Sequence, residues 1–101
     1  MTDTIEKTKI INNTDLSEPS QYKVIYINDE ITTFEFVISS LMEIFNYNEE
    51  TSYSIAKKVH DDGSGVVAVM PYELAEQKVL EATILARVYG FPLVVKIEAE
   101  N

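Results

Sequence analysis

The chain has 101 residues, the size of one domain, and its 46% hydrophobic and 25% charged residues are typical of a globular protein. It contains no cysteine, which excludes disulfides and thiolate metal sites, and its formal net charge of -9 disfavours nucleic acids and anionic lipids as partners. No apolar run reaches the roughly 18 residues of a membrane span and the N-terminus has no signal-peptide core, so we expect a cytoplasmic protein that favours cationic partners.

The first 20 residues are rich in Thr, Asn, Ser and Asp and end in the letters EPS. This composition predicts a flexible N-terminal extension at 1–20, followed by one folded domain at 21–101. The domain opens with a β-branched and aromatic run from Tyr22 to Asn28, which predicts a strand. Because the run is almost continuously apolar, we expect both faces of this strand to be at least partly covered.

A helix is expected in the segment 32–47, directly after the first strand. Thr32 followed three residues later by Glu35 has the pattern of a capping box, which predicts that the helix begins at Thr32. Apolar side chains recur at steps of three and four residues and form one stripe of this helix, namely Phe34, Ile38, Leu41 and Phe45.

The segment 48–63 predicts a second, shorter helix. Asn48 is its candidate N-cap, two acids follow in the first turn where the helix dipole favours them, and Gly63 is a natural terminator. One face of this helix carries Ser52, Ala56, Val59 and His60.

The remaining chain predicts a short buried strand at 65–70, the longest helix at 71–90 and a last strand before the C-terminus. Pro71 is tolerated where a helix starts, and Gly90 ends the helical pattern. The core stripe of the long helix consists of Ala75, Val79, Ala82, Ala86 and Tyr89. The last strand alternates Leu93, Val95 and Ile97 with outward-facing residues.

The predicted order is therefore strand, helix, helix, strand, helix, strand. This order indicates an α+β domain in which three helices pack on one face of a three-stranded antiparallel sheet. We expect the fold to resemble the C-terminal domain of the ribosomal stalk protein.

Asn28, Asp29 and Glu30 lie together between the first strand and the first helix. In one interpretation they only build a turn and complement a helix N-terminus. In the other they form a pocket rich in hydrogen-bond acceptors, which suits an ammonium because an ammonium has only donors. His60, the only histidine, has the same two interpretations: it complements the end of a helix, or its imidazole accepts a hydrogen bond from an amine.

The sequence does not favour an enzyme. It has no Gly-x-Ser-x-Gly, no glycine-rich phosphate loop and no paired histidine motif. His60 with Asp61 and Asp62 lacks a recognisable metal-ligand spacing. We therefore predict no catalytic residue, no metal site and no cofactor.

Four motifs in this order resemble the ClpS family: YKVIYINDEITTFEFV, KKVHDDG, PYELAEQKVLEA and FPLVVKIE. The resemblance spans residues 21–98. ClpS proteins are adaptors that bind N-degrons, which are free protein N-termini beginning with Leu, Phe, Tyr or Trp. They deliver these substrates to the ClpA unfoldase of the ClpAP protease.

The resemblance implies that Asn28 and His60 hydrogen-bond the free α-amino group and that Asp29 supports it, partly through water. It places Thr32 at the edge of a hydrophobic pocket. The implied pocket wall consists of Phe34, Val37, Ala56, Val59 and Leu93.

The resemblance also implies a docking surface for the N-terminal domain of ClpA on the long helix. Glu73 and Lys78 match the docking positions, and Glu76 is a further candidate on the same helix. The extension at 1–20 matches the family's segment that takes part in delivery.

Two wall positions depart from the family's usual residues. Phe34 stands where Met is common, and Ala56 stands where the family often has a larger residue such as Met at the pocket mouth. Phe34 should narrow one side of the pocket, whereas Ala56 should open it at the β-carbon of the ligand. From the change at Ala56 we expect Ile or Val as the first substrate residue to be tolerated better than in a relative with Met at that position. The alternative function is a non-catalytic interaction domain of the ribosomal-stalk type, without a pocket for a peptide terminus.

Overall fold

A computed structural model describes residues 20–100, so the predicted extension lies outside the described residues except for Ser20. The order of elements is the one expected from the sequence. The strands are β1 (Gln21–Ile27), β2 (Ser64–Pro71) and β3 (Val94–Ala99), and the helices are α1 (Phe34–Phe45), α2 (Glu49–Asp62) and α3 (Tyr72–Val88). None of the helices in residues 20–100 is long and apolar enough to cross a membrane.

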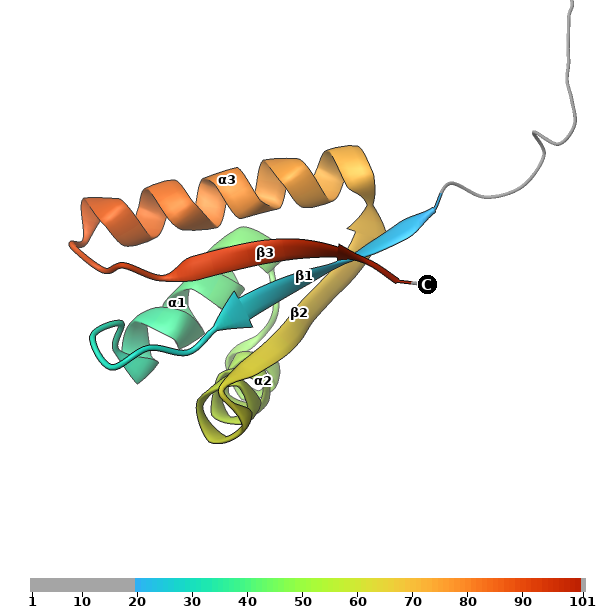
Figure 1. Cartoon of the computed structure of the whole chain (residues 1–101). Helices are drawn as coiled ribbons and strands as arrows, with labels where there is room; N and C mark the ends of the chain where they lie inside the picture. The colour runs from blue at the N-terminus through green and yellow to red at the C-terminus, as the bar shows by residue number, and fades with distance from the viewer. Residues whose placement is uncertain (1–19, 101) are drawn as a thin grey trace, which may run out of the picture.

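The sheet has the order β2-β1-β3, and both pairings are antiparallel. Its three helices pack on one face, which confirms the predicted α+β architecture (Figure 1). Val24 and Tyr26 of the central strand point into this layer and are fully buried. The side chains that α3 buries completely are all alanines, Ala75, Ala82 and Ala86. Because these side chains are small, the helix lies close to its neighbours.

The opposite face of the sheet is not covered by any described helix. Ile25 and Ile27 of β1 are nevertheless half-buried there, because Val66 and Val94 on the flanking strands are their partners in register. The prediction of a buried strand at β2 is wrong, since within this strand only Val67 is fully buried. β2 is an edge strand, so it has a neighbouring strand on one side only.

The start of α1 also differs from the prediction. Thr33 is the N-cap, and its hydroxyl accepts a hydrogen bond from the backbone N–H of Phe36 at 3.1 Å. The hydroxyl of Thr32 instead donates to Asp29 at 2.8 Å and cannot cap the helix. The buried residues of α1 are Phe36, Val37, Ser40, Leu41 and Ile44. Of the predicted stripe only Leu41 is among them, while Phe34, Ile38 and Phe45 are partly buried against the core.

The predicted caps of α2 are confirmed. The side chain of Asn48 accepts from the backbone N–H of Thr51 at 2.8 Å, and Gly63 ends the helix in the left-handed conformation with φ 88°. In α3 the expectation that Tyr89 belongs to the core stripe is wrong. The helix ends at Val88, and the Tyr89 side chain is 65% exposed beyond it.

A buried hydrogen bond joins the central strand to α1. The Ser40 hydroxyl donates to the backbone carbonyl of Val37 at 2.9 Å, so the Tyr26 hydroxyl is the donor in its 2.8 Å contact with Ser40. Burial raises the pKa of Tyr26 to about 12. The folded protein therefore retains this proton more strongly than the unfolded chain does.

We predict that Tyr26→Phe lowers the free energy of unfolding by about 1 kcal/mol at pH 7, the usual net contribution of one hydrogen bond. In the wild type the raised pKa of Tyr26 contributes to the free energy of unfolding. This contribution is complete below pH 10 and is lost as the pH rises toward 12. The stability of the variant should therefore fall less steeply across this range. Urea unfolding at several pH values measures both effects, and parallel curves for the two proteins would contradict the assignment.

Candidate functional site

The end of β1 and the end of α2 are joined by one backbone hydrogen bond. The N–H of Asn28 donates to the carbonyl of Gly63 at 2.9 Å. Gly63 can offer this carbonyl because its positive φ turns the chain sharply after α2. His60 lies in the last turn of the same helix. Two residues that are 32 positions apart in the sequence, Asn28 and His60, are thereby brought to one place.

A cavity of about 350 Å³ lies between this corner, α1 and α2. Its polar lining comes from Asn28, Asp29, Glu30, Thr32 and His60, and its apolar lining comes from Phe34, Val37, Ala56 and Val59. All but one of the residues expected at the α-amino site and the pocket wall therefore line one cavity. The exception is Leu93, which is 1% exposed in the core and is not part of the lining.

Asp29 organises the polar rim of the cavity. One carboxylate oxygen accepts from the backbone N–H groups of Ile31 and Thr32 at 2.8 and 2.6 Å, and the other accepts from the Thr32 hydroxyl at 2.8 Å. Burial would raise the pKa of Asp29, but the bonds from Thr32 and Ile31 and the charge of Arg87 lower it below its usual value. The carboxylate is therefore ionised at neutral pH.

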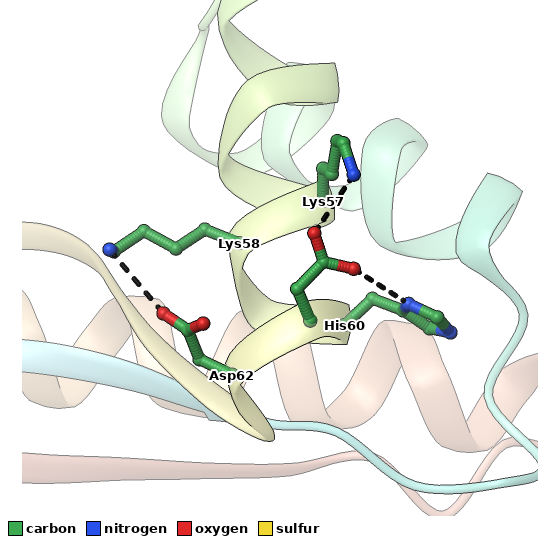
Figure 2. Close-up of polar contacts among 5 residues, drawn as sticks. Lys57, Lys58, His60 and Asp62 are labelled. Carbon is green, nitrogen blue, oxygen red and sulfur yellow. Dashed lines mark hydrogen bonds and ion pairs between the residues drawn. The ribbon is translucent and has the colours of Figure 1, made fainter.

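His60 is oriented by an acid that comes next in the chain. Its ring Nδ1 lies 3.4 Å from a carboxylate oxygen of Asp61, and the other oxygen of Asp61 accepts from Lys57 at 2.8 Å. Figure 2 shows Lys57 and His60 on either side of this shared carboxylate, while Lys58 pairs separately with Asp62. The carboxylate favours the tautomer with a proton on Nδ1, which leaves a lone pair on Nε2.

The apolar wall is formed by small side chains on one side and an aromatic ring on the other. Ala56 and Val59 are each 1% exposed on α2. The Phe34 ring meets the rings of Tyr53 and His60 edge to face, with centroids 5.5 and 6.2 Å apart. These contacts hold Phe34 against α2.

The three predicted docking residues on α3 have different surroundings. Glu73 and Glu76 are exposed and share a hollow of about 580 Å³ with the apolar side chain of Leu80. Lys78 lies outside this hollow, since its ammonium donates to the carbonyl of Ile44 at 3.0 Å. Lys78 therefore also ties α3 to the end of α1.

The cavity can bind a ligand that combines a hydrogen-bond donor with an apolar group. Within residues 20–100 the side-chain amide of Asn28 and Nε2 of His60 have no protein partner, so both can accept from a ligand. The described residues contain no cluster of three or more acids and histidines that could hold a metal ion. The free acceptors beside an apolar wall therefore suit the binding of a donor-bearing, partly apolar ligand.

Sequence reasoning missed the parts of the site that depend on contacts between elements. It did not assign roles to Asp61, which orients His60, or to Tyr53, which supports Phe34. The spacing of Lys57 and Asp61 by four residues on a helix was the available signal for the first of these. Nothing in the sequence pattern indicated the second.

The comparisons with known proteins agree with one another. The family described as ATP-dependent Clp protease adaptor protein ClpS matches residues 17–96. An ATP-dependent Clp protease adapter protein ClpS of Nautilia profundicola is 44% identical over 86% of this chain and 90% of its own length. That of Campylobacter jejuni is 40% identical over 93% of this chain and 98% of its own. A solved structure, Agrobacterium tumefaciens ClpS2 bound to L-phenylalaninamide, is 40% identical, with a TM-score of 0.79 over 82% of this chain and 100% of that one.

Replacing Asp29 tests its structural role. We predict that Asp29→Ala lowers the free energy of unfolding by about 1 to 2 kcal/mol, because two backbone N–H groups and the Thr32 hydroxyl lose their acceptor. The lowered pKa stabilises the wild type above about pH 4, and this contribution is lost as the pH falls below that value. Asp29→Asn keeps one acceptor oxygen, so its free energy of unfolding should lie between those of the wild type and Asp29→Ala. Equal stability of all three proteins in urea at pH 7 would disprove this role.

Proposed function

The chain belongs to the ClpS family of Clp protease adaptors, and on this premise we propose that it binds N-degrons and delivers them to the ClpA unfoldase. As a ClpS adaptor the protein acts in proteolysis without being an enzyme itself. The proposed ligands are free protein N-termini that begin with Leu, Phe, Tyr or Trp.

The observation that supports the proposal is the pairing of acceptors and apolar wall in one cavity. A protein N-terminus carries an ammonium and, one bond further on, its first side chain. The amide oxygen of Asn28 and Nε2 of His60 are acceptors for the ammonium, and the carboxylates of Asp29 and Glu30 add attraction at the rim. The first side chain would enter between Val37 and the residues of α2.

The magnitudes favour this combination over either part alone. Burying a bulky apolar side chain contributes about 1.5 to 3 kcal/mol, and each hydrogen bond to a charged group contributes about 1.5 to 3 kcal/mol. After the cost of association, micromolar binding of about -8 kcal/mol is reasonable. A lysine side chain has an ammonium without an adjacent apolar group, and an internal Phe has no free amine.

The related structure contains a ligand of the same kind. The Agrobacterium tumefaciens ClpS2 structure holds L-phenylalaninamide. This molecule has a free α-amino group, a benzyl side chain and an amide where the next peptide bond would begin. It therefore resembles an N-terminal phenylalanine, which supports the same ligand class for this chain.

For delivery we propose that ClpA docks on the first half of α3. Glu73 and Glu76 flank the hollow that contains Leu80, so the surface offers two acids around an apolar centre. Lys78 would contribute at the flank while it retains its bond to Ile44. The alternative, an interaction domain without a terminus pocket, is not favoured, because the chain is a ClpS family member and has a cavity at the expected place.

A binding assay with a short peptide that begins with Phe tests the proposal. We predict that N-acetylation weakens binding at least 100-fold, roughly the loss expected when buried acceptors keep no donor and the cation is removed. Asn28→Ala and His60→Ala should each weaken binding of the free peptide. Glu73→Lys is the matched control: it should retain peptide affinity and lose ClpA docking. Equal affinity for the free and acetylated peptides would refute the N-degron assignment.

The small side chain at position 56 generates a prediction about specificity. Ala56 contributes only a methyl group to the cavity wall, and Phe34 lines the same cavity, packed against Tyr53 and His60. In an Ala56→Met variant the larger side chain would meet the branched β-carbon of a first-residue Ile. We therefore expect the wild type to prefer Leu over Ile by a smaller ratio of affinities than the variant does. Titrations with matched peptides measure the ratio. A large preference for Leu that does not change in the variant would count against this explanation.

A further inference from the structure

A groove separate from the N-degron cavity runs between α1 and the second half of α3. It consists of two adjoining hollows of about 300 and 340 Å³, which share Glu43 and Leu85. The floor at one end is aromatic, with the Phe36 ring centroid 5.1 Å from that of Phe91. At the other end Ile84 and Val88 of α3 are 54% and 74% exposed. The groove thus offers an apolar surface that no described residue covers.

The rim of this groove is acidic. Glu35 and Glu43 lie two turns apart on the same face of α1, about 12 Å from one another along the helix axis. Within residues 20–100 neither carboxylate has an ion-pair or hydrogen-bond partner. Glu81, at the end of the groove on α3, already interacts with Lys78 at 3.5 Å. Among the described residues no lysine or arginine lines either hollow, so the groove is complementary to a cationic segment with bulky apolar side chains.

The chain itself contains such a segment outside the described residues. Residues 7–11 have the sequence KTKII, with Lys7 and Lys9 followed directly by Ile10 and Ile11. We propose that this segment docks into the groove, with the two lysines toward Glu35 and Glu43 and the isoleucines on the apolar floor. A second copy of the chain is a poorer occupant, because two molecules with a net charge of -9 repel one another.

The connecting chain is long enough for this contact. Ser20 lines the same hollow as Glu73 at the start of α3. From there the groove extends along α3 from Glu81 to Tyr89, about 12 to 24 Å away at 1.5 Å per residue. The chain between Ile11 and Ser20 spans up to about 30 Å when extended. The whole groove is therefore within reach.

Tethering makes even a weak contact effective. A short linker gives an effective concentration in the millimolar range, so a millimolar affinity is enough for about half of the molecules to be docked. Because the charges are exposed, the contact should weaken as salt is added. A partner that binds the extension must then compete with the groove for the segment 7–11. This inference does not depend on the N-degron assignment.

Paramagnetic relaxation in the full-length protein tests the inference directly. The chain has no cysteine, so a spin label on Thr8→Cys is attached at one site only. At low salt the amide signals of Glu43, Leu85 and Val88 should lose more than half of their intensity, and they should recover at about 0.5 M salt. The effect should not change on dilution, because the contact lies within one chain.

Charge reversal supplies the control. Glu43→Lys should restore most of the lost intensity, and adding Lys7→Glu and Lys9→Glu to that variant should bring the broadening back. Glu98→Lys makes the same change of charge on the exposed part of β3 and should have no effect. The inference is overturned if the groove signals keep their intensity at low salt. It is also overturned if Glu43→Lys and Glu98→Lys behave alike, or if dilution removes the effect and reveals a second copy. The affinity for a Phe-starting peptide, measured on the same variants, reports on the N-degron cavity alone. A failure of the groove proposal can therefore be told apart from a failure of the N-degron assignment.

Discussion

The hydrogen bond from the N–H of Asn28 to the carbonyl of Gly63 is the constraint on which the site depends. It joins the end of the central strand β1 to the end of α2 and brings Asn28 and His60 together. The glycines make this junction possible. Gly63 adopts φ 88°, and a Cβ on Gly65 would lie 3.0 Å from a methyl carbon of Val59, so β2 can start directly against α2. A side chain at position 65 would press on Val59, which lines the cavity.

The acidic corner after β1 builds a turn and also lines the cavity, so the two interpretations of the sequence do not exclude one another. Asp29 uses its two carboxylate oxygens to build the turn and is therefore a structural residue. Asn28 uses its backbone for the junction, and its side chain has no partner among residues 20–100. The turn and the acceptor-rich pocket are thus one arrangement. Rigid acceptors bind a ligand with a smaller loss of conformational entropy than mobile ones do.

Sequence reasoning predicted the order of the elements because hydrophobic periodicity and terminal residues are local signals. Asn48 and Gly63 were assigned correctly, since their capping bonds involve residues close in sequence. The cap of α1 was assigned to Thr32 and not Thr33 because both have the required hydroxyl, and the competing bond to Asp29 is visible only in the structure. The edge position of β2 likewise depends on sheet order, which local patterns do not encode.

The site residues were named through the resemblance to a family, and the structure brings most of them to one cavity. Their roles in binding remain proposals. A crystal structure of the protein with a peptide that begins with Phe is the most direct test. We predict that the α-amino nitrogen lies within hydrogen-bond distance of the Asn28 amide oxygen and the His60 ring, with the benzyl group between Val37 and Ala56. A peptide amine that points to solvent, or a benzyl group seated elsewhere on the protein, would contradict the account.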